Sequence, residues 1–302
     1  MNNIKDIVNR YAITPYRYTI KKNATIVDAD DGHFVFKKRT LENKNEELFK
    51  YLKSRNFLYF PNLINRDDQY DVYQYVEDVT TPREQKALDM MYLLSMLHNK
   101  TTFYKDADDD EFKAIYEDTI KDIEYIHNYY TDVITNIEKS IYMSPSDYLI
   151  ARNISKIFDT IMFSRREIEN WYELIKGKHK KRVATLHNNL DLDHLVRNDE
   201  LYLLSWDKSR QDMPFLDFLE FYNRYALEFD FDELLRVYES KYQLLKEERI
   251  LMFVLMSIPK KLEFKTSEIE RCREVRKFLD YIYKTEMLIT PYYSPEDNKE
   301  SN

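Results

Sequence analysis

Residues 186–207 read LHNNLDLDHLVRNDELYLLSWD, and this stretch decides how the rest of the chain is interpreted. Two short apolar runs, 183–186 and 201–204, flank a polar loop and are typical of strands. Most of the C-terminal two-thirds of the sequence has helical periodicity instead. The stretch therefore predicts a strand, a polar loop and a second strand set into a helical region, and such breaks often carry function.

The first eighty residues are typical of a small antiparallel sheet. Strands are expected at 17–21, 24–28 and 33–38, because β-prone runs alternate with the turn sequences Lys22-Asn23 and Asp30-Asp31-Gly32. A helix is expected over 40–53 and a further strand over 70–76.

From Thr81 onward the pattern becomes helical. Thr81-Pro82-Arg83-Glu84 has the sequence of a capping box with proline at the first helical position, and apolar side chains then repeat at the spacing of one buried face as far as His98. Further helices are predicted over about 110–140, after Ser144-Pro145, from Asp230 and from Ser267.

The composition narrows the class of protein. The 302 residues contain 46 basic and 54 acidic side chains, a formal charge of −8, which gives no support to a nucleic-acid partner. A single cysteine excludes an internal disulfide and a multi-cysteine metal site. No segment has the pattern of a signal peptide or a membrane span, so we expect a cytoplasmic protein without a membrane partner.

Two local features bear on phosphate binding. Gly32 and Gly177 are the only glycines, which disfavours any glycine-rich phosphate loop. Residues 176–182, KGKHKKR, concentrate positive charge and could meet phosphate or an acidic partner, but a solvated loop is the favoured interpretation.

The stretch quoted first resembles the catalytic loop and metal-binding strand of the aminoglycoside phosphotransferases and choline kinases. In that superfamily the loop reads His-Gly-Asp, with an asparagine five residues after the aspartate, and the later strand reads Ile-Asp-Phe or Ile-Asp-Trp. The resemblance places Asn189 at the catalytic aspartate, His194 at the metal-binding asparagine and Ser205 at the metal-binding aspartate. His187 would keep its structural role. The spacing is that of the superfamily, whereas the reactive groups are replaced.

The resemblance extends along most of the chain, over roughly residues 12–285. It implies that Lys37 is the phosphate-pairing lysine and that Glu46 or Glu47 is its partner, with no means of choosing between them. It also places Gln74 and Val76 in the hinge that would contact a nucleotide. Residues 214–218 match the Pro-x-x-Asp-Leu element of the superfamily. The stretch 232–264 is similar to the bacterial spore-coat kinase-like branch, which implies a spore association if that likeness holds.

The implied fold is α+β and two-lobed, of the protein-kinase-like type. Residues 1–77 would form an N-lobe with a small antiparallel sheet and one helix. Residues 78–302 would form a mostly helical C-lobe that contains the degenerate loop 186–207. ATP with magnesium is the cofactor that the superfamily implies, but the replaced positions disfavour it here, and no other cofactor is expected.

Other roles for the polar residues of the loop stay open at this point. Asp191 or Asp193 could replace the missing base, and Asp207 could replace the metal ligand, because residues two apart on a strand share a face. The combination of His187, Asp191, Asp193 and His194 could also suit zinc or manganese, although the loop spacing favours the kinase-like interpretation.

Three functions follow from these alternatives. The favoured one is a pseudokinase that binds or scaffolds, because Asn189, His194 and Ser205 lack the groups of the catalytic machinery. The second is an active small-molecule phosphotransferase with a rearranged site. The third is a nucleotide or metabolite sensor. The partner, whether a small molecule or a protein, is not identified by the residues.

Overall fold

A computed structural model describes residues 14–21, 24–39, 45–66, 69–263 and 267–293. The chain divides into two compact units. The first unit comprises residues 1–101 and 187–209, and the second comprises 102–186 and 210–302. The sequence placed a lobe boundary at residue 77, whereas contacts group residues 78–101 and the loop from His187 with the N-terminal sheet.

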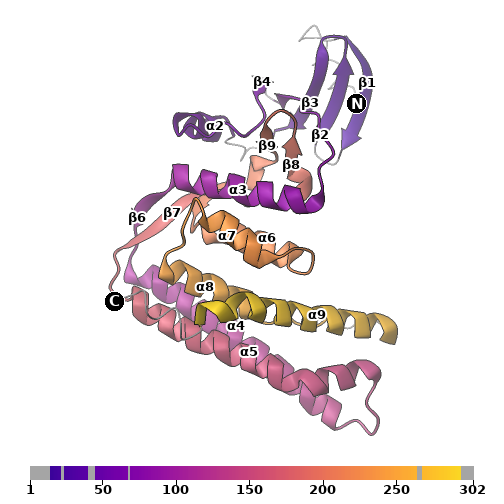
Figure 1. Cartoon of the computed structure of the whole chain (residues 1–302), viewed down its shortest axis with the longest axis vertical. Coiled ribbons are helices and arrows are strands. Elements are labelled where there is room, and N and C mark those ends of the chain that lie inside the picture. Colours follow the sequence, from indigo (N-terminus) through magenta and orange to yellow (C-terminus); the bar gives the residue numbers. More distant parts are fainter. Residues whose placement is uncertain (1–13, 22–23, 40–44, 67–68, 264–266, 294–302) are drawn as a thin grey trace. The chain divides into compact units, whose positions relative to one another are not determined.

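The first unit is built on a five-stranded antiparallel sheet (Figure 1). Its strands lie in the order β1-β2-β3-β5-β4. Their bounds are β1 Pro15–Lys21, β2 Ala24–Ala29, β3 Gly32–Lys38, β4 Leu63–Arg66 and β5 Tyr70–Gln74. The turn between β2 and β3 leads into Gly32, the first residue of β3, at φ 132°, a backbone conformation that other residues rarely adopt. The buried residues Val27, Phe36 and Val72 form the core of this sheet.

Two helices and the loop region complete the first unit. They are α2 Asn45–Ser54, α3 Arg83–Thr101, the 3-10 turn η1 Leu192–His194, the hairpin strands β8 Leu195–Arg197 and β9 Leu201–Leu203, and the 3-10 turn η2 Trp206–Lys208. Trp206 is 2% exposed and joins them, because its ring packs edge-on against Phe49 of α2 and against Phe57 and Phe60. The loop is therefore anchored on the same aromatic cluster as α2.

The second unit is mostly helical. It has a three-stranded antiparallel sheet in the order β10-β7-β6, made of β6 Phe103–Asp106, β7 Lys180–Leu186 and β10 Arg210–Asp212. Its helices are α4 Asp109–Glu138, α5 Pro145–Ile175, α6 Phe215–Tyr225, α7 Phe231–Glu239, α8 Lys246–Ser257 and α9 Glu268–Ile289, with the 3-10 turn η3 Thr290–Tyr293. Helix α5 is central, because it packs against α4, α8 and α9 (Figure 1).

Local sequence explains several of the helix starts. Asp108 accepts a hydrogen bond from the Glu111 N–H at the start of α4, and Ser144 accepts one from the Asp147 N–H at the start of α5, where Pro145 occupies the first turn. Asp230 caps α7 in the same way. These side chains satisfy N–H groups that the helix itself leaves unpaired.

The predicted fold class is confirmed, with differences in detail. Strands β1, β2, β3 and β5 lie where they were expected, and β7 and β9 flank the loop. The capping box at Thr81 is wrong: α3 begins at Arg83, and the Thr81 hydroxyl donates to the Val79 carbonyl instead. Helix α2 begins at Asn45, and residues 40–44, the first part of the predicted helix, lie outside the described residues.

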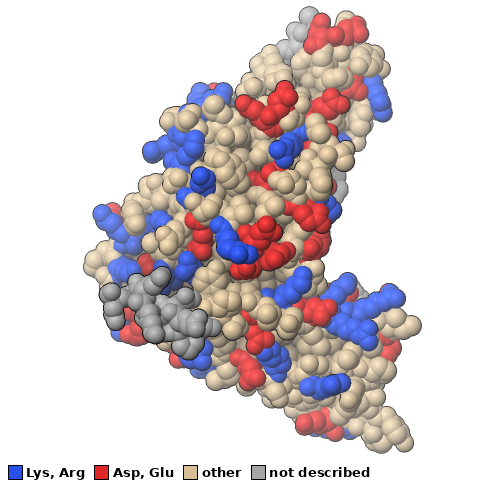
Figure 2. Space-filling model, viewed as in Figure 1, with Lys and Arg blue, Asp and Glu red and all other residues tan. Residues whose placement is uncertain are grey.

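The predicted basic patch at residues 176–182 is largely engaged in ion pairs within the second unit. Lys178 Nζ lies 2.5 Å from Glu247, and Lys181 pairs with Glu111. Arg182 pairs with the buried Glu248. On the face shown in Figure 2, basic and acidic residues are interspersed. No helix in the described part of the chain is long and apolar enough to span a bilayer.

Candidate functional site

His187 fixes the start of the loop. The residue is fully buried, and its Nε2–H donates to the Leu204 carbonyl at 2.7 Å, since a carbonyl oxygen can only accept. Its ring packs edge-on against Trp206 with centroids 4.8 Å apart. The side chain thus ties the beginning of the loop to the end of β9, which is the structural role that the sequence assigned to it.

The backbone of the loop keeps two left-handed residues. Asn188 has φ 54° and Ser205 has φ 65°. Asn188 stands where the resemblance has glycine, and asparagine tolerates this conformation better than most residues. Its amide also donates to the Lys208 carbonyl at 3.1 Å. Serine has no such tolerance, so the strain at Ser205 is held by its surroundings.

Asn189 is committed to holding the loop together. Its side-chain Nδ2 donates to the Ser205 carbonyl at 3.2 Å, and its main-chain carbonyl accepts from His194 Nδ1 at 2.7 Å. Because a carbonyl accepts only, Nδ1 carries the proton of His194. A neutral amide has no proton-accepting power near neutral pH, so Asn189 cannot act as a general base.

The two acidic residues that could have replaced this base serve other roles. The Asp191 carboxylate accepts a hydrogen bond from the Asp193 N–H at 3.0 Å and so caps η1. Asp193 is exposed. The alternative metal cluster with His187 and His194 is wrong: all four side chains lie in the described part of the chain, where no three His, Cys, Asp or Glu side chains form a group that could hold a metal.

Lys37 and Asp207 form an ion pair across the first unit. Lys37 lies on β3 and Asp207 on η2, and their side chains are 18% and 34% exposed. Asn45 and Tyr73 border the pair. The amide of Asn45 lies 3.5 Å from the second carboxylate oxygen of Asp207 and 3.4 Å from the Tyr73 hydroxyl. Burial raises the pKa of Tyr73 to about 12, so its hydroxyl stays protonated at neutral pH.

The expected pairing of Lys37 with a glutamate of α2 is therefore wrong. Glu46 pairs instead with Lys50 and with Arg66, each at 2.6 Å, and Glu47 is exposed. The hydrogen bond and charge of Lys50, followed by the charge of Arg66, lower the pKa of Glu46. The first turn of α2 presents Asn45, rather than a carboxylate, toward the pair.

The predicted hinge residues lie at the end of β5. Gln74 is exposed, and its N–H donates to the Asn62 carbonyl at 3.0 Å. The next residue, Tyr75, donates its N–H to the His33 carbonyl at 3.1 Å, which extends the pairing with β3. Val76 follows and is half-buried. A nucleotide contact by Gln74 and Val76 stays a prediction.

The residues at this site do not fit a magnesium–nucleotide complex. Magnesium is usually held by one or two carboxylates together with the phosphates of the substrate. At the two metal positions of the resemblance the chain has His194 and Ser205, and neither supplies a hard anionic oxygen. Asp207 does, but it is bound to Lys37, the cation that the resemblance would direct to phosphate.

Sequence reasoning did not find Asn45 and Tyr73. Neither belongs to a recognisable motif, and their place beside Asp207 depends on the register of α2 and β5 against a segment more than 130 residues later. No helix-start signal pointed to Asn45, because it lies inside the predicted helix 40–53 rather than at its beginning.

Comparison with known proteins gives a clear answer for the fold. No protein-family model and no curated protein matches the sequence. Among solved structures, an aminoglycoside phosphotransferase from Alicyclobacillus acidocaldarius is similar with a TM-score of 0.65 at 11% identity, over 93% of this chain and 94% of that one.

Two further solved structures agree. A spectinomycin phosphotransferase bound to AMP has a TM-score of 0.54 at 10% identity, over 94% of this chain and 97% of that one. A choline kinase from Streptococcus pneumoniae has a TM-score of 0.50 at 12% identity, over 93% and 99%. Identities this low speak for architecture and leave activity open. The chain has the two-lobed, kinase-like fold of the aminoglycoside phosphotransferases and choline kinases.

Proposed function

We propose that this protein is a catalytically impaired member of the kinase fold that acts as a binding or scaffold module. The observation that carries the proposal is the ion pair between Lys37 and Asp207. In this pair the Lys37 ammonium, which would bind phosphate, and the Asp207 carboxylate, which would bind a metal ion, neutralise each other. A phosphotransferase needs both charges free for its substrate.

The chemistry of the loop supports the same proposal. Catalysis of phosphoryl transfer rests on positioning and on electrostatic stabilisation, together with a residue that orients the attacking hydroxyl. Asn189 supplies no base, and its amide is already used to hold Ser205. Asp191 caps a turn and Asp193 is exposed, so neither is poised to substitute.

The alternative is an active small-molecule phosphotransferase with a rearranged site. One observation favours it: Asp207 keeps about a third of its side chain exposed, so an incoming cation could reach it. This function requires Asp207 to exchange Lys37 for a metal ion. A nucleotide or metabolite sensor that binds without chemistry would make the same exchange and show saturable binding alone. The likeness to the spore-coat branch rests on residues 232–264 and remains a prediction.

A gain-of-function variant tests the proposal. The double variant Asn189→Asp, Ser205→Asp restores the two carboxylates on a backbone that already has the loop conformation. We expect the wild-type melting temperature to be unchanged by ATP with magnesium, and that of the double variant to rise. At ten times the dissociation constant, binding adds about 1.4 kcal/mol to the free energy of unfolding, or about 2–4 °C.

A matched control separates charge from position. The variant Asn198→Asp, Ser209→Asp adds two carboxylates to the same segment away from the two motif positions, and it should show no magnesium-dependent shift. Magnesium-dependent ATP turnover by the wild-type protein that disappears in Lys37→Ala would overturn the proposal and establish the phosphotransferase. A shift of the wild type without turnover would establish the sensor.

A further inference from the structure

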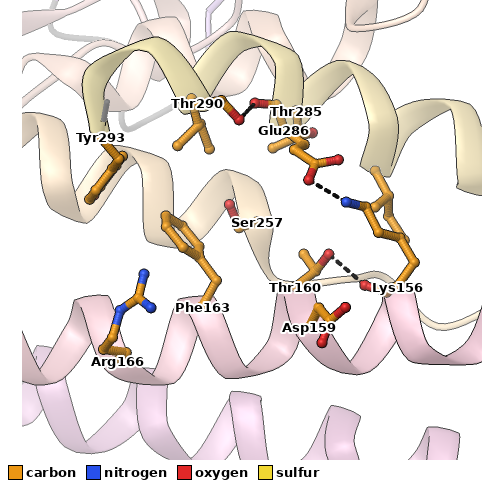
Figure 3. A pocket seen from close by; sticks show the side chains of 12 residues that line it. Lys156, Asp159, Thr160, Phe163, Arg166, Ser257, Thr285, Glu286, Thr290 and Tyr293 are labelled. Atoms are coloured by element: carbon orange, nitrogen blue, oxygen red, sulfur yellow. Dashed lines mark hydrogen bonds and ion pairs between the residues drawn. The ribbon is translucent and has the colours of Figure 1, made fainter. Parts of the chain in front are cut away.

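The second unit contains a cavity that the kinase-like site does not use. Its volume is about 370 Å³, within the range of about 300–1,000 Å³ typical of small-molecule sites. The residues that line it come from the middle of α5, the end of α8, the C-terminal half of α9 and η3 (Figure 3). None of these residues belongs to the loop 187–209, so a ligand held here would be independent of that loop.

One end of the cavity has an apolar and aromatic wall. Phe163 and Tyr293 pack edge-on with ring centroids 5.3 Å apart, and Ile282 and Ile289 extend the wall along α9. Burial, followed by the negative charge of Glu167, raises the pKa of the Tyr293 phenol, which therefore stays neutral. This wall suits the flat or aliphatic body of a ligand, because covering the apolar surface removes it from water.

A hydroxyl group lines the floor of the cavity. Ser257, the last residue of α8, is only 4% exposed and lies at the centre of the cavity in Figure 3. Its hydroxyl has no hydrogen-bond partner among the residues that the structure describes, whereas Thr160 and Thr290 on the cavity wall bond to the carbonyls of their own helices. This hydroxyl can therefore donate a hydrogen bond to a polar atom of a ligand, or accept one from it.

The charges around the cavity cancel except for one. Lys156 of α5 pairs with Glu286 of α9, and Arg166 donates to the buried Glu167 at 2.9 Å. Asp159, one turn from Lys156 on α5, also lines the cavity and makes no ion pair with any described residue. The uncompensated charge of the lining is therefore a single carboxylate.

From these observations we infer that the cavity is a binding site for a small amphipathic cation, an ammonium group carried on an aromatic or aliphatic body. The ammonium group binds the Asp159 carboxylate through a charge-assisted hydrogen bond. The body covers Phe163, Tyr293 and the isoleucines of α9. A polar atom of the ligand bonds to the Ser257 hydroxyl.

Tyramine is a suitable probe, because it combines a flat ring, a hydroxyl group and an ammonium group, and 4-ethylphenol is its counterpart without the charge. We expect saturable tyramine binding to the full-length wild-type protein in isothermal titration calorimetry, at least fivefold tighter than that of 4-ethylphenol. Asp159→Asn should weaken tyramine binding at least fivefold and leave 4-ethylphenol unaffected. Ser257→Ala should weaken both.

Control variants keep the test independent of folding and of the kinase-like site. Glu169→Gln removes an exposed carboxylate from the same helix, and Lys37→Met alters the kinase-like site, and both should leave tyramine binding unchanged. Melting temperatures verify that each variant is folded. The absence of saturable tyramine binding at millimolar concentration, equal affinity for the two probes, or tyramine binding that survives Asp159→Asn would each overturn the inference.

Discussion

Replacing Asp207 by asparagine removes the charge that holds the Lys37 ammonium and nearly preserves the shape of the side chain. Exposed ion pairs contribute about 0.2–1 kcal/mol to the free energy of unfolding, and breaking a fully buried pair costs about 3–5 kcal/mol. The two side chains are 18% and 34% exposed, so the pair lies nearer the exposed class. We expect a coupling free energy of about 1 kcal/mol, a factor of about five in the folding equilibrium.

A double-mutant cycle isolates this coupling. It compares the wild type, Lys37→Met, Asp207→Asn and the double variant by urea denaturation, and subtracts the effects that each residue has without the other. If the cycle gives less than about 0.2 kcal/mol, the pair adds nothing measurable to the free energy of unfolding and costs little to open. Lys37 would then be available to phosphate, and the main support for an impaired site would be lost. Glu47→Gln, an exposed change on α2, should leave the cycle unaltered.

Three further predictions concern stability and are checked by chemical denaturation. Glu248→Ala removes the buried carboxylate that pairs with Arg182, whose side chain is 11% exposed, and should cost about 3–5 kcal/mol. Glu173→Ala, at an exposed position of α5, should stay within about 0.5 kcal/mol. Equal losses would contradict the burial argument. Burial raises the pKa of Tyr222 to about 12, above about 10 in the unfolded chain. The contribution of the neutral phenol to the free energy of unfolding is therefore complete below pH 10 and is lost as the pH rises to 12. Tyr222→Phe should make that decline of stability shallower. Ser205→Val should cost about 1–3 kcal/mol and Ser205→Gly nothing, because glycine adopts positive φ freely whereas a β-branched residue does not. A harmless valine would refute the strain there.

The fold was largely predictable because its signals are local. The hairpins follow from turn residues such as Gly32, the helix starts from single caps such as Ser144 and Asp230, and the loop from the spacing between His187 and the strand that ends before Ser205. Each of these features is decided within a few residues, so the sequence carries enough information to place it.

The partners of the site residues could not be predicted in the same way. The likeness to the superfamily assigned Lys37 a glutamate on α2. One residue of helical register decides which side chain of α2 lies beside Asp207, and Asn45 occupies that place. Asp207 is 170 residues away from Lys37 in the sequence. The ion pairs of the basic run at 176–182 could not be predicted for the same reason, because the acidic partners of its lysines lie on helices about 70 residues before or after it.

The chain has two tryptophans, and the fold assigns one to each compact unit. Trp206 belongs to the aromatic cluster of the first unit and Trp171 to α5 of the second, and both are 2% exposed. Their indole emission should be blue-shifted in the native protein and move to longer wavelength when each site meets water. Trp171→Phe would leave a fluorophore that reports on the loop unit alone, and Trp206→Phe one that reports on the helical unit. Unfolding of the two halves can thus be followed optically without any added label.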